Sequence, residues 1–146
     1  MKKTEGPRST NYFDTFIEVA EDCPVTKAEI PKQKGEEKTI AFLQYEMMVH
    51  YPYRYTQDDV LFNIYAVRND LDIKSKTERD RFFSKGQACL RSSPLGKRYG
   101  WGVHADEKGR VAIYPVESKE YKKLASDKKL LHLKGMRTSR LVKKKN

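Results

Sequence analysis

The chain has 146 residues, of which 38% are hydrophobic and 34% are charged. This length fits one folded domain, and the polar composition argues against a protein embedded in a membrane, because no stretch is long and apolar enough to cross a bilayer. The net charge of +10 favours partners that carry negative charge, among them nucleic acids, whose phosphates release counterions when a basic surface binds.

The excess positive charge lies mostly near the two ends of the sequence. Residues 1–8 carry a net charge of +2 and residues 135–146 carry +5, which leaves +3 for residues 9–134. We therefore expect a flexible N-terminus over residues 1–10, a single domain over residues 11–134 and a basic, flexible tail over residues 135–146.

Two features bear on the cellular compartment. No apolar run follows the lysines at the start of the sequence, so a secretory signal is not expected and the chain is predicted to be cytosolic. The two cysteines, Cys23 and Cys89, are too few for a disulfide framework and are expected to be thiols.

The first half of the chain predicts a strand followed by two helices. Residues 15–20 (TFIEVA) alternate in the manner of a strand and are rich in residues that favour one. Residues 39–50 place apolar side chains three and four positions apart, which predicts a helix with a buried face. A second helix is expected from Thr56, with Asp58 and Asp59 in its first turn, where carboxylates favour the positive end of the helix dipole.

The second half predicts two shorter helices, a hairpin and a C-terminal helix. One helix is expected to begin at Thr77. Another is expected to begin at Ser93, because the residue after it is proline, which suits the first helical position. Residues 101–116 alternate on both sides of a short polar loop and predict a β-hairpin. Ser118 is expected to cap a helix that ends at Gly135, with a break near Asp127 as the alternative.

These elements predict an α+β fold of one domain. Strand 15–20 and hairpin 101–116 are expected to form a small antiparallel sheet covered by about four helices. The helices that begin at Thr39, Thr56 and Ser118 are expected to cover the apolar face of this sheet.

Several stretches are similar to a known family. They are NYFDTFIEVAEDCPVT, AFLQYE, DDVLF, FFSKGQACLRSSPLGKRYGWGVH and VAIYPVESKEY. In these stretches the chain resembles a family of small bacterial proteins classed as a domain of unknown function, over roughly residues 11–140. The resemblance implies no activity, ligand or residue role.

A basic stretch in the centre of the chain predicts an anion-binding site. No acidic residue lies between Asp80 and Asp106, and a predicted helix start there offers exposed N–H groups beside hydroxyls and a guanidinium. The alternative is that Ser93 only caps its helix while Arg91 pairs with a surface carboxylate. The predicted ligand is an unknown anionic small molecule or partner. The predicted binding residues are Arg91, Ser92, Ser93, Lys97, Arg98 and His104.

Nucleic-acid binding, assisted by the basic tail, is an alternative function. Tyr99, Trp101 and Tyr114 lie near Lys97 and Arg98, and aromatic side chains beside cations are typical of proteins that stack the bases of single strands. Trp101 is better explained as a core residue, because a small domain needs large apolar side chains.

No metal site and no cofactor are predicted. His50, His104 and His132 are far apart in the sequence, and the glycines form neither a dinucleotide-binding fingerprint nor a P-loop. An unrecognised enzyme that uses the same pocket is a third alternative. Cys89, His104 and Asp106 could supply a nucleophile, a base and an orienting group, although a cysteine is often buried simply as a small apolar residue.

Overall fold

A computed structural model describes residues 8–138 of the chain, and these residues form five α-helices, one short 3-10 helix and a sheet of four strands. The α+β prediction is confirmed. In chain order the elements are β1 (Thr15–Glu18), α1 (Ile40–His50), α2 (Gln57–Arg68), α3 (Lys76–Phe83), the 3-10 helix η1 (Leu90–Ser92), α4 (Pro94–Lys97), β2 (Trp101–Ala105), β3 (Val111–Pro115), α5 (Lys119–Ala125) and β4 (Leu131–Lys134).

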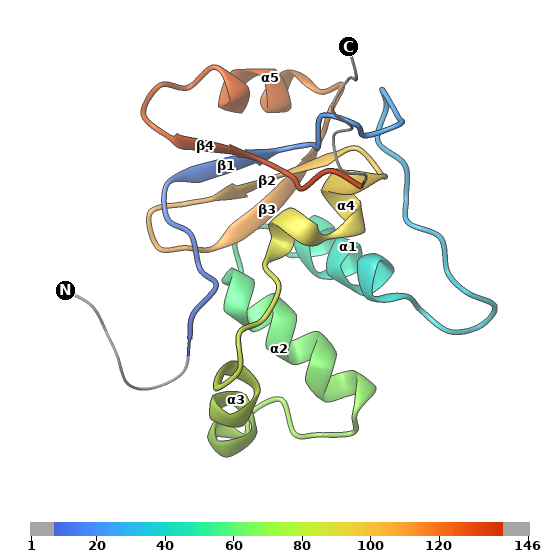
Figure 1. Cartoon of the computed structure of the whole chain (residues 1–146), viewed down its shortest axis with the longest axis vertical. Helices are drawn as coiled ribbons and strands as arrows, with labels where there is room; N and C mark the ends of the chain where they lie inside the picture. The colour runs from blue at the N-terminus through green and yellow to red at the C-terminus, as the bar shows by residue number, and fades with distance from the viewer. Residues whose placement is uncertain (1–7, 139–146) are drawn as a thin grey trace, which may run out of the picture.

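The sheet is mostly antiparallel, with the strand order β3-β2-β1-β4 (Figure 1). The predicted hairpin is formed by β2 and β3, and β1 pairs with β2 in the antiparallel sense, with Phe16 opposite His104. β4 pairs with β1 in the parallel sense, with Phe16 opposite His132. The first and last strands in the sequence, β1 and β4, therefore lie side by side, and β4 forms one edge of the sheet.

The predicted helix from Ser118 to Gly135 is wrong in its second half. After α5 the chain turns and enters β4, where the Leu131 N–H donates to the Asp14 carbonyl at 2.9 Å and the Gly135 N–H donates to the Glu18 carbonyl at 2.7 Å. The leucine-rich pattern of this stretch suits either element, and the open backbone edge of β1 selects the strand.

Each face of the sheet is covered by different helices. Ile17, Val103 and Ile113 point to the face where α1, α2 and α4 pack, and this side holds the larger core. Phe16 points to the other face, where it meets Tyr121 of α5 edge-on at 5.0 Å between ring centroids. The prediction that the helix from Ser118 shares a face with the other helices is therefore wrong, because alternate strand residues point to opposite faces.

The helix starts follow the polar residues at their N-termini. Thr39, Thr56 and Ser118 each accept a backbone N–H at the predicted helix starts, and Thr56 forms a reciprocal capping box with Asp59. The helix expected from Thr77 instead begins after Ser75, whose hydroxyl accepts the N–H of Glu78. Within residues 8–138 there is no helix with the length and apolar character needed to span a bilayer.

The ends of the described range make contacts with the body of the fold. Thr10 bonds to α2, and the Met136 N–H donates to the carbonyl of Arg91 at 2.7 Å. The predicted domain boundaries stay predictions, and most of the predicted flexible N-terminus and basic tail, residues 1–7 and 139–146, lies outside the described residues.

Candidate functional site

A cavity of about 350 Å³ lies between α1, α2 and the segment 87–94, and we call it the α1–α2 cavity. Its size falls at the lower end of the range of about 300–1,000 Å³ that is usual for small-molecule sites. Its apolar lining consists of Ile40, Leu61, Ile64, Tyr65, Phe82, Ala88 and Pro94. Its polar lining consists of Gln44, Arg68, Asn69, Gln87, Cys89, Ser92 and Ser93.

Gln44 and Ser93 form a buried polar pair beside this cavity. The Ser93 hydroxyl accepts the N–H of Leu95 at 3.0 Å and donates to Gln44 Oε1 at 2.6 Å. Gln44 is only 5% exposed, and no acceptor among residues 8–138 bonds its Nε2 amide group. Among residues 8–138 the only fully buried side-chain polar atom without a hydrogen-bond partner is Arg110 Nε, so the Gln44 amide is open to solvent at the cavity and is available to a ligand oxygen.

Arg68 places a positive charge at the rim of the cavity. It is the last residue of α2, and its Nη1 donates to the carbonyl of Lys38 at 3.2 Å. No carboxylate among the residues that the structure describes forms an ion pair with it. Its charge is therefore available to an anion that enters the cavity.

Aromatic side chains form the wall of the cavity on the side of α3. The rings of Tyr65 and Phe82 lie 4.5 Å apart at a tilt of 33°, and Phe62 lies 5.8 Å from Phe82. These contacts pack α3 against α2. The wall therefore depends on the position of α3.

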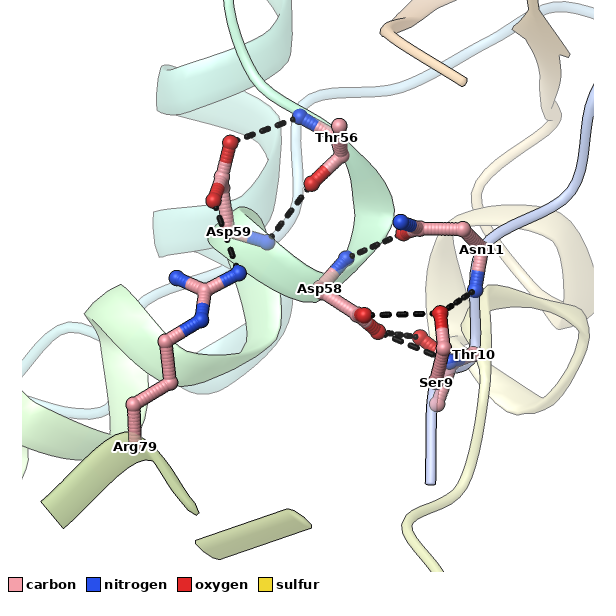
Figure 2. Close-up of polar contacts among 7 residues, drawn as sticks. All are labelled: Ser9, Thr10, Asn11, Thr56, Asp58, Asp59 and Arg79. Carbon is pink, nitrogen blue, oxygen red and sulfur yellow. Dashed lines mark hydrogen bonds and ion pairs between the residues drawn. The ribbon is translucent and has the colours of Figure 1, made fainter. Parts of the chain in front are cut away.

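A network of charged and polar groups holds α3 and the N-terminal segment on α2 (Figure 2). Asp59, in the first turn of α2, forms an ion pair with Arg79 of α3 at 2.9 Å. Asp58 accepts hydrogen bonds from Ser9 and Thr10, and its own N–H donates to Asn11 Oδ1 at 2.9 Å. Both aspartates lie at the helix start that the sequence predicts, and the tertiary structure adds these long-range partners.

Gln57 connects this network to the segment that lines the cavity. Its Nε2 donates to the Thr10 carbonyl at 2.8 Å, and its Oε1 accepts the backbone N–H of Leu90. Because Gln57 is only 1% exposed, both bonds are shielded from water. It thereby fixes the position of the 3-10 helix η1, which contains Ser92 of the cavity lining and begins directly after Cys89.

Four of the six predicted binding residues lie at or beside the cavity. Ser92 and Ser93 line it. Lys97 and Arg98 line a neighbouring groove of about 680 Å³, which we call the basic groove. The groove shares Ile40, Arg68 and Pro94 with the cavity, so the two hollows meet at these residues.

Arg91 and His104 are not part of this arrangement. Arg91 donates from Nε to the carbonyl of Lys134 at 2.9 Å, which places it beside β4. His104 points to the α5 side of the sheet, where its Nδ1 lies 2.7 Å from the Tyr53 hydroxyl. The Tyr53 hydroxyl also meets the Tyr114 hydroxyl at 2.8 Å. The six predicted residues therefore do not converge on one site.

Burial changes the acidity of the His104 and Tyr53 pair. Partial burial lowers the pKa of His104 below its ordinary value of 6.5, against an opposing effect from Asp106. Burial, together with the hydrogen bond to the Tyr114 hydroxyl, raises the pKa of Tyr53. At neutral pH the imidazole is therefore uncharged, and Tyr53 keeps its proton.

Cys89 and His104 do not meet, so the hypothetical trio with Asp106 is not assembled. Cys89 lies beside the α1–α2 cavity, with its Sγ 3.5 Å from the hydroxyl of Tyr12. Burial and the nearby thiol raise the pKa of Tyr12. Within residues 8–138, no three histidine, cysteine, aspartate or glutamate side chains come together as metal ligands.

Trp101 is a core residue, as its size suggested. Its ring packs 5.4 Å from Tyr45, and its Nε1 donates to the carbonyl of Glu29 at 2.8 Å. Tyr99 differs, because it is partly exposed and lines the basic groove.

The most important cavity residues, Gln44 and Arg68, were not among the predicted site residues. Gln44 carries a signal in the sequence, since it is a polar residue within the apolar stripe of Ile40, Leu43 and Met47. Arg68 carries none, because its lack of a carboxylate partner results from the tertiary arrangement.

No curated protein and no solved structure is significantly similar to the chain. A match to a family model covers residues 7–141, nearly the full length. The chain therefore belongs to the family of unknown function DUF6157.

Proposed function

We propose that this protein binds a small organic anion in the α1–α2 cavity. The observation that carries the proposal is the side-chain amide of Gln44, a residue that is 5% exposed: the amide lies at the cavity and has no acceptor among the described residues. A ligand oxygen would supply that acceptor. The proposal keeps the anion-binding expectation and moves its centre from the start of α4 to the space between α1 and α2.

The lining supports a ligand with one apolar part and one charged part. Tyr65 and Phe82 offer an aromatic surface, whereas Arg68 offers a cation at the rim that no carboxylate of residues 8–138 pairs with. Pockets that are mostly apolar with a few polar groups are typical of small-molecule sites, in which the polar groups set the orientation of the ligand. A carboxylate or phosphate ester with a compact apolar body fits this description.

The experiment compares phenylacetate with its uncharged analogue phenylacetamide. Binding is followed by NMR on the backbone amides of Gln44 and Ser93 and on the Gln44 side-chain amide. Phenylacetate is expected to bind and phenylacetamide to bind at least about tenfold more weakly, because loss of one charge-assisted contact costs about 1.4 kcal/mol or more.

Two variants with the same change in charge locate the contact. Arg68→Gln is expected to weaken phenylacetate binding by about tenfold. Arg54→Gln is the control, because Arg54 stacks on Tyr51 at 5.4 Å and does not line the cavity. Equal affinities in both variants, or no shift at Gln44 with either probe, would contradict the proposal.

Nucleic-acid binding is a second candidate, and the basic groove favours it. The groove places Tyr99 beside Lys97 and Arg98, a combination of ring and cations that suits single strands. A neighbouring hollow shares Arg98 and Tyr99 and reaches Thr138, which belongs to the basic tail of residues 135–146. This function predicts an affinity for single-stranded DNA that falls steeply with salt and weakens on deletion of residues 139–146.

The cytosolic location stays a prediction. The alternative that the protein is an enzyme also stays a prediction, and no reaction is assigned to the cavity.

A further inference from the structure

The α1–α2 cavity and the basic groove are neighbouring hollows. They share Ile40, Arg68 and Pro94 as lining residues. The cavity is mostly apolar, whereas the groove is lined by five cations, Lys34, Lys38, Arg68, Lys97 and Arg98, and one acid, Glu37. A ligand that fills both hollows has an apolar end and a strongly anionic end.

Most of the cations in the groove have no carboxylate partner in the described part of the chain. Lys38 pairs with Glu46 at 3.2 Å. Lys34, Lys97 and Arg98 form no ion pair with any carboxylate among residues 8–138, and the same holds for Arg68. Four unpaired cations around one groove produce a positive field that attracts a multiply charged anion more than a single carboxylate.

The start of α1 adds backbone donors to the same groove. α1 has 11 residues, no acidic residue in its first turn, and Thr39, Ile40 and Ala41 at the groove. The Thr39 hydroxyl accepts the N–H of Phe42, and the N–H groups of Ile40 and Ala41 have no acceptor among the described residues. Unpaired N–H groups at a helix start, together with the helix dipole, suit the oxygens of a phosphate.

We infer that the ligand of the α1–α2 cavity is an organic phosphate, with its apolar or aromatic group in the cavity and its phosphate in the basic groove. This inference rests on the proposed function, because it requires the cavity to bind the apolar group. It adds the class of the anion: a phosphate carries more charge than a carboxylate and has three oxygens for the Arg68 guanidinium, the lysines and the helix N–H groups. The Gln44 amide then donates to the ester oxygen that joins the apolar group to the phosphate.

The experiment measures the affinities of phenyl phosphate, phenylacetate and inorganic phosphate for the full chain by calorimetry at one fixed salt concentration. Phenyl phosphate is expected to bind about tenfold or more tightly than either of the other probes, because only it can use both hollows. Lys97→Gln/Arg98→Gln is expected to remove most of this advantage and to leave phenylacetate within about twofold of its original affinity.

A matched double variant controls for the loss of two charges. Lys122→Gln/Lys123→Gln lies on α5, on the opposite side of the sheet, and is expected to leave all three affinities unchanged. If phenylacetate binds through Arg68 but phenyl phosphate has no advantage, the inference falls while the proposed function stands. If inorganic phosphate binds as tightly as phenyl phosphate, the cavity plays no part and the inference also falls. If no probe binds, both the inference and the proposed function fail.

Discussion

Thr10 donates both its backbone N–H and its hydroxyl to a single carboxylate oxygen of Asp58, at 2.7 Å and 2.6 Å (Figure 2). The other oxygen accepts the hydroxyl of Ser9 at 2.8 Å. Asp58 is only 8% exposed, so these bonds to a charged acceptor are largely shielded from water. They fasten the N-terminal segment to the start of α2, and Gln57 continues the connection to the segment that lines the cavity.

Asp58→Asn is expected to lower the free energy of unfolding by about 1.5–3 kcal/mol, because hydrogen bonds to a charged acceptor are stronger than those to an amide oxygen. Urea unfolding measures this loss, and hydrogen exchange should show less protection at the amide of Thr10. Asp70→Asn is the control, since Asp70 is exposed and has a φ of 56°, which asparagine adopts easily. A loss of stability as large in the control would contradict the assigned role of Asp58.

Gly102→Ala is expected to destabilise the fold by about 1–3 kcal/mol, because an added methyl group has no room. A Cβ at this position would lie 2.6 Å from the Tyr121 ring and 2.8 Å from the Phe16 ring. Thermal and urea unfolding measure the effect. Gly96→Ala is the control, since its Cβ would meet the Trp101 carbonyl at an ordinary 3.5 Å. Stability unchanged in Gly102→Ala would show that α5 does not press on the sheet there.

His104 is expected to make the stability of the fold depend on pH. The dependence falls between the pKa of His104 in the folded state and its pKa in the unfolded state. Burial lowers the folded-state pKa below the ordinary value of 6.5. Above the unfolded-state pKa the imidazole is neutral in both states, and its contribution to stability is fully present. As the pH falls, the unfolded state is protonated first, so stability is lost until the folded-state pKa is also passed.

The measurement is urea unfolding of the parent chain and of His104→Asn at pH values of about 7.5 and about 5.5. Asparagine keeps a polar group near the Tyr53 hydroxyl but does not titrate. The parent should lose more stability than the variant over this interval. Equal losses would show that His104 is not the titrating group.

Cys89 should report the occupancy of the cavity. It lines the α1–α2 cavity, whereas Cys23, which is also a partly buried free thiol, does not. At a phenylacetate concentration of about ten times its dissociation constant, alkylation of Cys89 by iodoacetamide is expected to slow by about tenfold, because the free state is depleted by that factor. Alkylation of Cys23 in the same sample is the internal control. Equal rates at Cys89 with and without phenylacetate would place the probe elsewhere.

Local patterns in the sequence predicted most of the elements. The alternation in residues 101–116 predicted the hairpin, and the apolar spacing in residues 39–50 predicted α1. Thr56 and Ser118, as helix caps, predicted the starts of α2 and α5. These signals are local because a cap and a strand alternation need only a few neighbouring residues. β4 was missed because its identity depends on pairing with β1, more than 110 residues earlier in the chain.

For the candidate site, the sequence by itself determined that Ser92, Ser93, Lys97 and Arg98 belong to an acid-free stretch around a helix start. Only the tertiary structure decided that Gln44 and Arg68 join this group and that His104 does not. α1 and α2 bring the first two from positions far earlier in the chain, whereas the pleat of β2 turns His104 to the opposite face from Val103. Such placement depends on long-range packing, which no local pattern encodes.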